Sequence, residues 1–237
     1  MKIILLTIIS GMSTVVGNIF LLIPKKYKNK IIPLTLSLSF ITIFLISIFD
    51  LIPNALALTN NHNKIITFIK SLLLLMIGYS IVKKIDKKTT RTNSLHQIGI
   101  LSTITLIIHN IPEGIICVMS SLIDYKIGLK MLIIIMIHNI PEGISISLPI
   151  YYGTKSKLKA ITYTIISGLG ELVGAIITML FLKPYITETF LYTLLLITSG
   201  IMIYLSIKLL KESQKYQNKY YIFIGIISGV VIFILSH

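Results

Sequence analysis

The chain has 237 residues, of which 54% are hydrophobic and 13% are charged, and its mean hydropathy is +0.90. So little charge cannot cover the surface of a soluble domain of this length, whereas a polytopic membrane protein needs little charge. The net charge of +14 lies in basic clusters between apolar runs, which suits an anionic lipid bilayer and argues against a nucleic-acid partner. Cys117 is the only cysteine, so disulfides within the chain and cysteine-rich metal sites are excluded.

Eight apolar runs approach the length of about 20 residues that a membrane-spanning helix needs. They are residues 3–23, 32–52, 65–82, 98–121, 128–150, 159–182, 186–207 and 220–236. The first run follows Lys2 as a secretory signal would, but it lacks a small-residue cleavage site, so we expect a spanning helix there. The sequence therefore predicts an all-α membrane protein with eight transmembrane helices in a single polytopic domain over residues 1–237.

The basic residues predict how the chain is oriented in the membrane. They cluster in the links after the first, third, fifth and seventh runs, at residues 25–30, 83–91, 155–159 and 208–219. Because cytoplasmic links are enriched in lysine and arginine, we expect these four links to be cytoplasmic, including a long loop at about 83–97, and both termini to be extracellular. The expected location is the cell (plasma) membrane, as a multi-pass protein of a bacterial inner membrane.

The sequence His-Asn-Ile-Pro-Glu-Gly occurs at residues 109–114 and again at 138–143, in the fourth and fifth predicted helices. Its glutamates, Glu113 and Glu142, lie near the middle of these helices, and Glu171 lies near the middle of the sixth. An acidic side chain at the bilayer centre costs about 2.5–3.5 kcal/mol, so three of them indicate a function.

The spacing within the repeat predicts a metal site. The histidine and glutamate are four residues apart and share one helix face, and the asparagine is close enough to converge with the glutamate. The two helices are antiparallel neighbours with their motifs at midspan, so the motifs meet at the same depth. The residues expected to face one small volume are His109, Asn110, Glu113, His138, Asn139, Glu142 and Glu171. Imidazole and carboxylate ligands suit zinc, iron and related divalent ions, and the lack of thiolates argues against copper(I).

Proline and glycine in the repeat predict broken helices. Pro112 and Pro141 cannot donate a backbone hydrogen bond, while Gly114 and Gly143 allow another helix to approach closely. Free carbonyls at membrane depth must face protein or a wet cavity, and paired broken helices are typical of a transporter's binding site. The alternative is a pair of kinked helices whose histidines and glutamates only pair with each other, but the repetition and the third glutamate favour a metal site.

Eight helices with both termini outside, and HNIPEG in the fourth and fifth, resemble the ZIP (Zrt-, Irt-like protein) metal transporters, particularly their prokaryotic branch. The stretch SGLGELVGAI at 167–176 is similar to the family's motif in the sixth helix, with Glu171 as its acidic ligand. The stretch FDLIPNAL at 49–56 is similar to a family pattern in which a polar residue precedes Leu-x-Pro. The resemblance covers essentially the whole chain, and its specific part is helices 4 to 6.

The resemblance implies a 3+2+3 arrangement, in which helices 1–3 and 6–8 form an inverted repeat around the broken helices 4 and 5. It also implies a site for two metal ions. The first ion would be bound by His109, Glu113, His138 and Glu142. The second would be bound by Asn110, Glu113, Asn139, Glu142 and Glu171, so that both motif glutamates bridge.

Two features depart from the family pattern. Many members have a histidine-rich link between helices 3 and 4, whereas this link is lysine-rich with only His96. Some relatives offer a methionine of helix 2 to the first metal, but residues 31–52 contain none, which leaves Ser37, Ser39 or no residue in that role. Asp50, at the outer end of helix 2, is a candidate for attracting cations at the entrance, or equally a carboxylate in the headgroup layer.

The function expected from these features is transport of a divalent metal cation into the cytoplasm through a midspan two-metal site. Zinc is the first expectation, with iron, manganese and cadmium as alternatives, and the metal is the substrate rather than a catalytic cofactor. A homodimer is left open. The competing hypothesis is a membrane metalloenzyme with a carboxylate-bridged di-metal centre, but the chain has no His-Glu-x-x-His sequence and no soluble lobe for a large substrate.

Overall fold

The computed structural model describes residues 2–59, 63–89, 94–123, 125–182, 185 and 187–236, and these residues contain helices and no β-strand. Residues 90–93 of the predicted loop at about 83–97 lie outside the described residues. The elements in chain order are α1 (Lys2–Met12), η1 (Ser13–Leu22), η2 (Lys25–Tyr27), α2 (Lys28–Ile46), η3 (Ser47–Leu51), α3 (Ile52–Ala57), α4 (Lys64–Thr89), α5 (Ser94–Ile123), α6 (Tyr125–Thr154), α7 (Lys157–Ile177), η4 (Thr178–Leu182), α8 (Glu188–Gln214) and α9 (Lys219–Ser236).

Each predicted apolar run corresponds to helix over most of its described residues. Within the described residues, seven helical stretches are long and apolar enough to cross a membrane: Ile4–Leu22, Lys25–Ala57, Lys64–Lys88, Leu95–Leu122, Gly128–Thr154, Lys157–Phe181 and Glu188–Gln214. The eighth run corresponds to a shorter apolar helix, Lys219–Leu235. An all-helical, multi-pass membrane protein is therefore confirmed.

The predicted breaks at Pro112 and Pro141 are wrong. Both α5 and α6 continue as single helices through these prolines. Each proline removes one backbone hydrogen bond, but a helix of 30 residues keeps the others and is packed against its neighbours on both sides of the proline. Irregular helical backbone occurs instead in the 3-10 segment η1 of the first span, in the π-helical segment η3 of the second, which carries Asp50, and in the π-helical segment η4 after α7.

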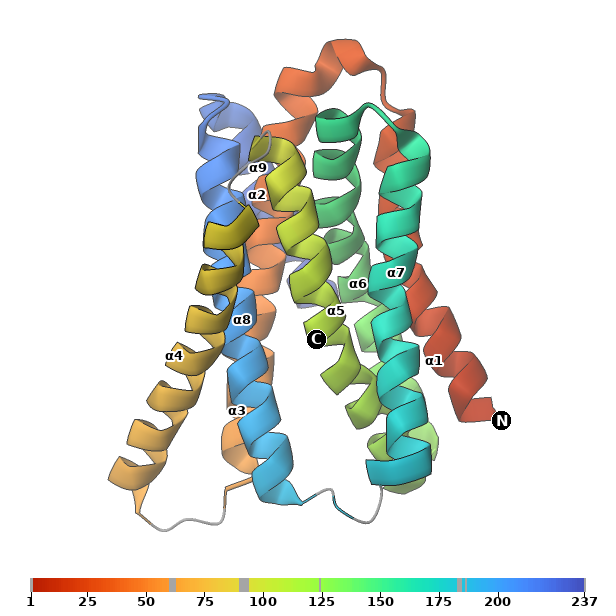
Figure 1. Cartoon of the computed structure of the whole chain (residues 1–237), viewed down its shortest axis with the longest axis vertical. Coiled ribbons are helices and arrows are strands. Elements are labelled where there is room, and N and C mark those ends of the chain that lie inside the picture. The colour runs from red at the N-terminus through yellow and green to blue at the C-terminus, as the bar shows by residue number, and fades with distance from the viewer. Residues whose placement is uncertain are drawn as a thin grey trace.

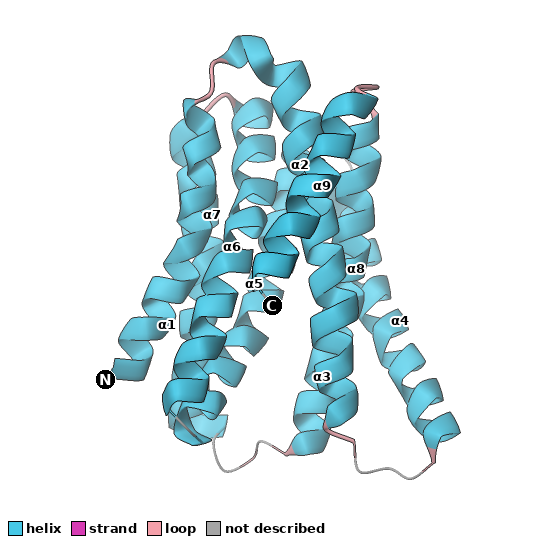
Figure 2. Ribbon diagram, turned by 180° about the vertical axis from the view of Figure 1, so that it is seen from behind, coloured by secondary structure: helices cyan, strands magenta, loops and turns pink. Residues whose placement is uncertain are grey.

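The helices form two groups (Figures 1 and 2). In the first group, α5 packs on α6 and α7, while α1 and η1 pack on α6 and α7. In the second group, α2 packs on α8 and α9, α4 packs on α8, and α3 also contacts α8. Contacts of α2 with α6 and of α5 with α8 join the two groups, which diverge toward the lower end of Figure 1.

A polar cluster around Asp86, in the lysine-rich last turns of α4, joins the two groups. The buried carboxylate of Asp86 on α4 accepts hydrogen bonds from three side chains: Tyr204 Oη at 2.7 Å, Lys208 Nζ at 2.5 Å and Gln97 Nε2 at 2.8 Å. Tyr204 and Lys208 lie on α8 of the second group, but Gln97 lies on α5 of the first. The Asp86 cluster therefore ties the two groups together.

Backbone contact between α4 and α8 depends on two glycines and generates a prediction about stability. A Cβ atom at Gly200 would collide with the carbonyl oxygen of Leu75, and one at Gly78 would collide with that of Ile197. We expect Gly200→Ala to lower the free energy of unfolding by about 1–3 kcal/mol, because the helices would have to separate. Thermal unfolding in detergent measures this. Ile77→Ala, at an exposed position beside the same crossing, is the control, and equal melting temperatures for both variants would contradict the prediction.

Candidate metal site

Close backbone packing holds the two repeated motifs against α7 and η1. A Cβ atom on Gly114 would collide with the carbonyl oxygen of Glu171 on α7, and one on Gly143 would collide with that of Thr14 in η1. The expectation that these glycines allow close approach is confirmed. Because α7 touches the backbone of the first motif, Glu171 is held beside the fourth and fifth predicted helices, α5 and α6.

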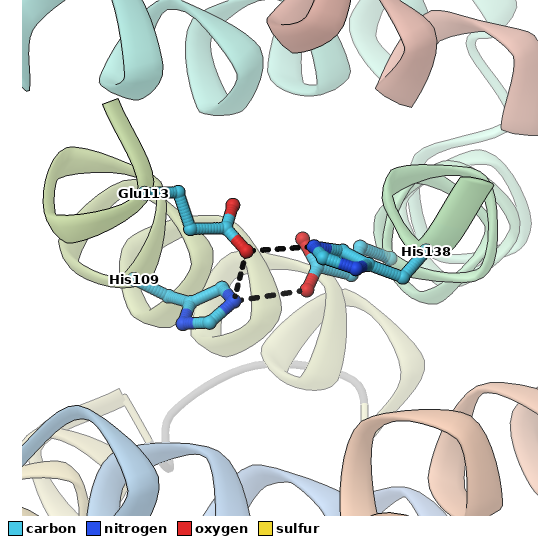
Figure 3. A group of neighbouring side chains, drawn as sticks. His109, Glu113 and His138 are labelled. Atoms are coloured by element: carbon cyan, nitrogen blue, oxygen red, sulfur yellow. Dashed lines mark hydrogen bonds and ion pairs between the residues drawn. The ribbon is translucent and has the colours of Figure 1, made fainter. Parts of the chain in front are cut away.

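The histidines and glutamates of both motifs form one buried cluster (Figure 3). Glu113 Oε1 lies 2.7 Å from His138 Nε2 and 3.1 Å from His109 Nε2. His109 Nε2 also lies 3.3 Å from Glu142 Oε1. One ligand atom from each of the four residues lies within 4.8 Å of the others, and none of the four is more than 5% exposed. We refer to these four residues as the His–Glu cluster.

The donor set of the His–Glu cluster fits a tetrahedral divalent ion. Zinc takes four ligands at about 2.0–2.2 Å from nitrogen and oxygen, which places the donor atoms about 3.3–3.6 Å apart. Three of the distances between donor atoms are 2.7–3.3 Å and all lie within 4.8 Å, a spread that brackets the tetrahedral spacing, so small side-chain movements would admit the ion. Two imidazoles and two carboxylates also form a mixed set of nitrogen and oxygen ligands, which suits zinc.

The remaining predicted ligands lie on the other side of the motifs. Asn139 Nδ2 donates to Glu171 Oε1 at 2.5 Å and to the carbonyl oxygen of Ser10 at 3.1 Å. Asn110 Nδ2 donates to the carbonyl oxygen of Ser167 at 3.0 Å. The Oδ1 atoms of both asparagines and Oε2 of Glu171 are buried and have no hydrogen-bond partner among the described residues. The structure thus brings Asn139 and Glu171 together and leaves three oxygens free to bind a cation.

A cavity of about 400 Å³ leads to the His–Glu cluster between α3, the later part of α5 and the first parts of α6 and α8. Glu113 and His138 line it at one side, and Asp50 lines it as well, with its Oδ1 accepting a hydrogen bond from Asn54 at 2.6 Å. The cavity wall also contains Met131, whose thioether the sequence analysis missed. Its signal was present, because Met131 lies two helical turns before His138 on the same face of α6.

The serines considered in place of a helix 2 methionine are engaged elsewhere. Ser39 Oγ donates to the carbonyl oxygen of Pro141 at 2.7 Å, and Ser37 Oγ donates to that of Pro33 at 2.7 Å. Ser39 therefore joins α2 to the second motif through the backbone. Both serine hydroxyls are thus bonded to backbone carbonyls. These contacts do not support either serine as a ligand of the first metal.

The fold and the site define a polytopic α-helical membrane protein with a buried cluster of two histidines and two glutamates that could hold a metal ion. The family model described as ZIP Zinc transporter matches residues 82–236, and the chain belongs to this family. The chain is 31% identical over 250 residues to the zinc transporter ZupT of Streptococcus mutans, covering 98% of this chain and 95% of that protein. It is 33% identical over 257 residues to ZupT of Oceanobacillus iheyensis, again covering 98% and 95%.

A third relative, ZupT of Lysinibacillus sphaericus, is 32% identical over 254 residues, covering 98% of this chain and 94% of that protein. The resemblance drawn from the motifs is therefore confirmed. All three relatives are named as transporters, and the chain is not an enzyme, so the metalloenzyme hypothesis is rejected.

The His–Glu cluster predicts that Glu113 dominates metal affinity, since its Oε1 faces both histidines. We expect Glu113→Gln to weaken zinc binding. The loss of affinity should exceed the factor of about 10–100 that is typical when a residue contacting a metal ligand, rather than the metal itself, is removed. Isothermal titration of the purified protein with zinc measures the change. The control is Glu188→Gln at the exposed start of α8, which should bind as the unaltered protein does. Unchanged affinity in Glu113→Gln would mean that this carboxylate is structural.

Proposed function

We propose that this protein is a divalent metal cation transporter that carries zinc into the cytoplasm. The observation that carries the proposal is the buried His–Glu cluster, whose ligand atoms lie within 4.8 Å of one another beside a cavity. Membership of the ZIP family and the zinc transporters among its relatives support zinc as the substrate. Iron, manganese and cadmium are the competing ions to be tested.

The transported metal occupies two positions. The His–Glu cluster binds one ion, and Asn110, Asn139 and Glu171 bind a second, with Glu113 and Glu142 shared between them. The unpartnered oxygens of both asparagines and of Glu171 support the second position, because a buried polar atom without a partner is unfavourable unless a ligand satisfies it.

The chain is a single domain over residues 1–237 with an inverted 3+2+3 repeat, and the helix contacts support this arrangement. In an inverted repeat, α1–η1 corresponds to α7, α2–α3 to α8, and α4 to α9. The two central helices, α5 and α6, correspond to each other. Under this exchange, each main helix contact is replaced by another contact that the structure also has. The contact of α2 with α9 becomes that of α8 with α4, and the contact of α5 with α7 becomes that of α6 with η1. The weaker contacts of α6 with α2 and of α5 with α8 are likewise exchanged.

The protein lies in a bacterial plasma membrane with its lysine-rich links in the cytoplasm and both termini outside. In this orientation the cavity opens to the exterior, and Asp50 in its wall attracts entering cations. The Asp86 cluster then closes the cytoplasmic side between the two helix groups. Metal crosses when the first group, α1, α5, α6 and α7, moves against the second and exposes the site to the cytoplasm.

Uptake into sealed proteoliposomes tests the function. We expect saturable entry of zinc, and a competition series with iron, manganese and cadmium ranks the substrates. Glu113→Ala is the control, since it removes the carboxylate that both histidines face. Folded, zinc-binding protein that supports no more metal entry than protein-free vesicles would contradict the proposal.

A disulfide across the Asp86 cluster tests the movement of the two groups. Asp86 and Gln97 are joined by a side-chain contact of 2.8 Å, so we propose the pair Asp86→Cys and Gln97→Cys in a Cys117→Ser background. We expect oxidation to abolish zinc uptake while zinc binding from outside persists, and reduction to restore uptake. Each single-cysteine variant is a control. Equal uptake rates for the oxidised and reduced pair would favour a channel-like path.

A further inference from the structure

A second repeated sequence accompanies the metal-binding repeat. Ile-Ile-Ser-Gly occurs at residues 8–11 on α1 and at 165–168 on α7. The two copies meet in the structure. A Cβ atom on Gly11 would collide with the carbonyl oxygen of Gly168, and a Cβ atom on Gly168 would collide with that of Gly11. The Gly11 position also lies beside Glu171, whose Cβ would be 3.5 Å away. This crossing therefore places both serines next to the proposed second metal position.

Each serine holds one asparagine of the metal-binding repeat. The carbonyl oxygen of Ser167 accepts from Asn110 Nδ2, and that of Ser10 accepts from Asn139 Nδ2. The first pair joins α7 to α5, and the second joins α1 to α6, so the pairs are exchanged by the same symmetry as the helix contacts. Because the amide nitrogens face the serine carbonyls, the amide oxygens are left free.

The hydroxyls of these two serines lack a fully formed hydrogen bond within the described part of the chain. Ser10 Oγ and Ser167 Oγ are fully buried and make no hydrogen bond of normal geometry with the described residues. Nearby hydroxyls behave differently, since Ser13 Oγ donates to the carbonyl of Ser10 and Thr14 Oγ1 to that of Gly11. Burying a hydroxyl without a hydrogen-bond partner is unfavourable, and a bound cation would offset this.

The position of the hydroxyls relative to Glu171 indicates what satisfies them. Ser167 lies four residues before Glu171 and shares its face of α7. The Ser10 hydroxyl, on α1, lies close to the Glu171 carboxylate. We infer that the hydroxyl oxygens of Ser10 and Ser167 are two further ligands of the second metal position. This inference rests on the proposed two-metal site.

The added ligands give the two positions different chemistry. The first position combines imidazoles with carboxylates, a set that suits zinc. The second position has only oxygen donors, from hydroxyl, amide and carboxylate groups, which suit harder divalent cations such as manganese. The second position therefore accepts a wider range of divalent cations than the first, and the serines contribute to this by adding neutral oxygen rather than charge.

Cobalt binding to cysteine variants tests whether the serines reach the ion. Ser10→Cys and Ser167→Cys, each in a Cys117→Ser background, are titrated with cobalt(II), and thiolate-to-cobalt charge-transfer absorption is recorded. We expect the absorption in both variants. The control is Ser228→Cys, because residues 226–229 of α9 carry a third copy of Ile-Ile-Ser-Gly away from the metal-binding repeat. Absorption absent from both test variants, or equal in the control, overturns the inference.

Alanine variants test the same point without a new ligand. Ser10→Ala and Ser167→Ala keep a small side chain at the crossing, so packing alone predicts no change in metal binding. We expect the affinity for the second manganese ion to fall by about tenfold in each, measured by titration calorimetry. Glu171→Ala separates the two proposals. If Glu171→Ala loses the second ion but the serine variants keep it, the serine assignment alone is overturned. If the unaltered protein binds only one ion per chain, the two-metal site is overturned as well.

Discussion

Buried carboxylates at the centre of the bundle are the constraint on which the rest of the structure depends. Glu113, Glu142 and Glu171 lie where water cannot solvate them, so each must face a cation, a histidine or an amide. Their histidine and asparagine partners lie on α5 and α6, and Asn139 also donates to the Ser10 carbonyl of α1, so these helices and α7 converge at one depth. Small residues at the crossings allow that convergence, and a divalent ion at the proposed site would supply positive charge to the carboxylates.

The same constraint separates the molecule into two groups. Ligands lie on the first group of helices, whereas the second group contributes cavity wall and the carboxylate of Asp86 rather than the His–Glu cluster. A metal bound wholly within one group can move with it, because no coordination bond to the other group must break. The contacts between the groups include apolar packing, the hydrogen bond from Ser39 to the Pro141 carbonyl and the Asp86 cluster, which can part and re-form.

Prediction from the sequence was accurate where a residue's role depends on its position along one helix. The i, i+4 spacing of His109 and Glu113 places both on one face, and the structure confirms that they meet the corresponding pair of the second repeat. Prediction was wrong for Pro112 and Pro141, because a missing hydrogen bond breaks a helix only when neighbouring contacts do not hold it straight. Met131 was missed because, although it shares a helix face with His138, the sequence does not show how far along that face a cavity extends.

The sequence by itself determined the class of protein, the number and order of the apolar helices and the identity of the central polar residues, because hydropathy and helical periodicity are properties of short segments. Only the tertiary structure decided which of these residues contact one another. It separated His109, Glu113, His138 and Glu142 from Asn110, Asn139 and Glu171, and it brought Ser10 to a site 129 residues away in sequence, at Asn139. Those relations depend on how helices cross, and crossings are set by close packing of small residues between distant segments, which no local pattern encodes.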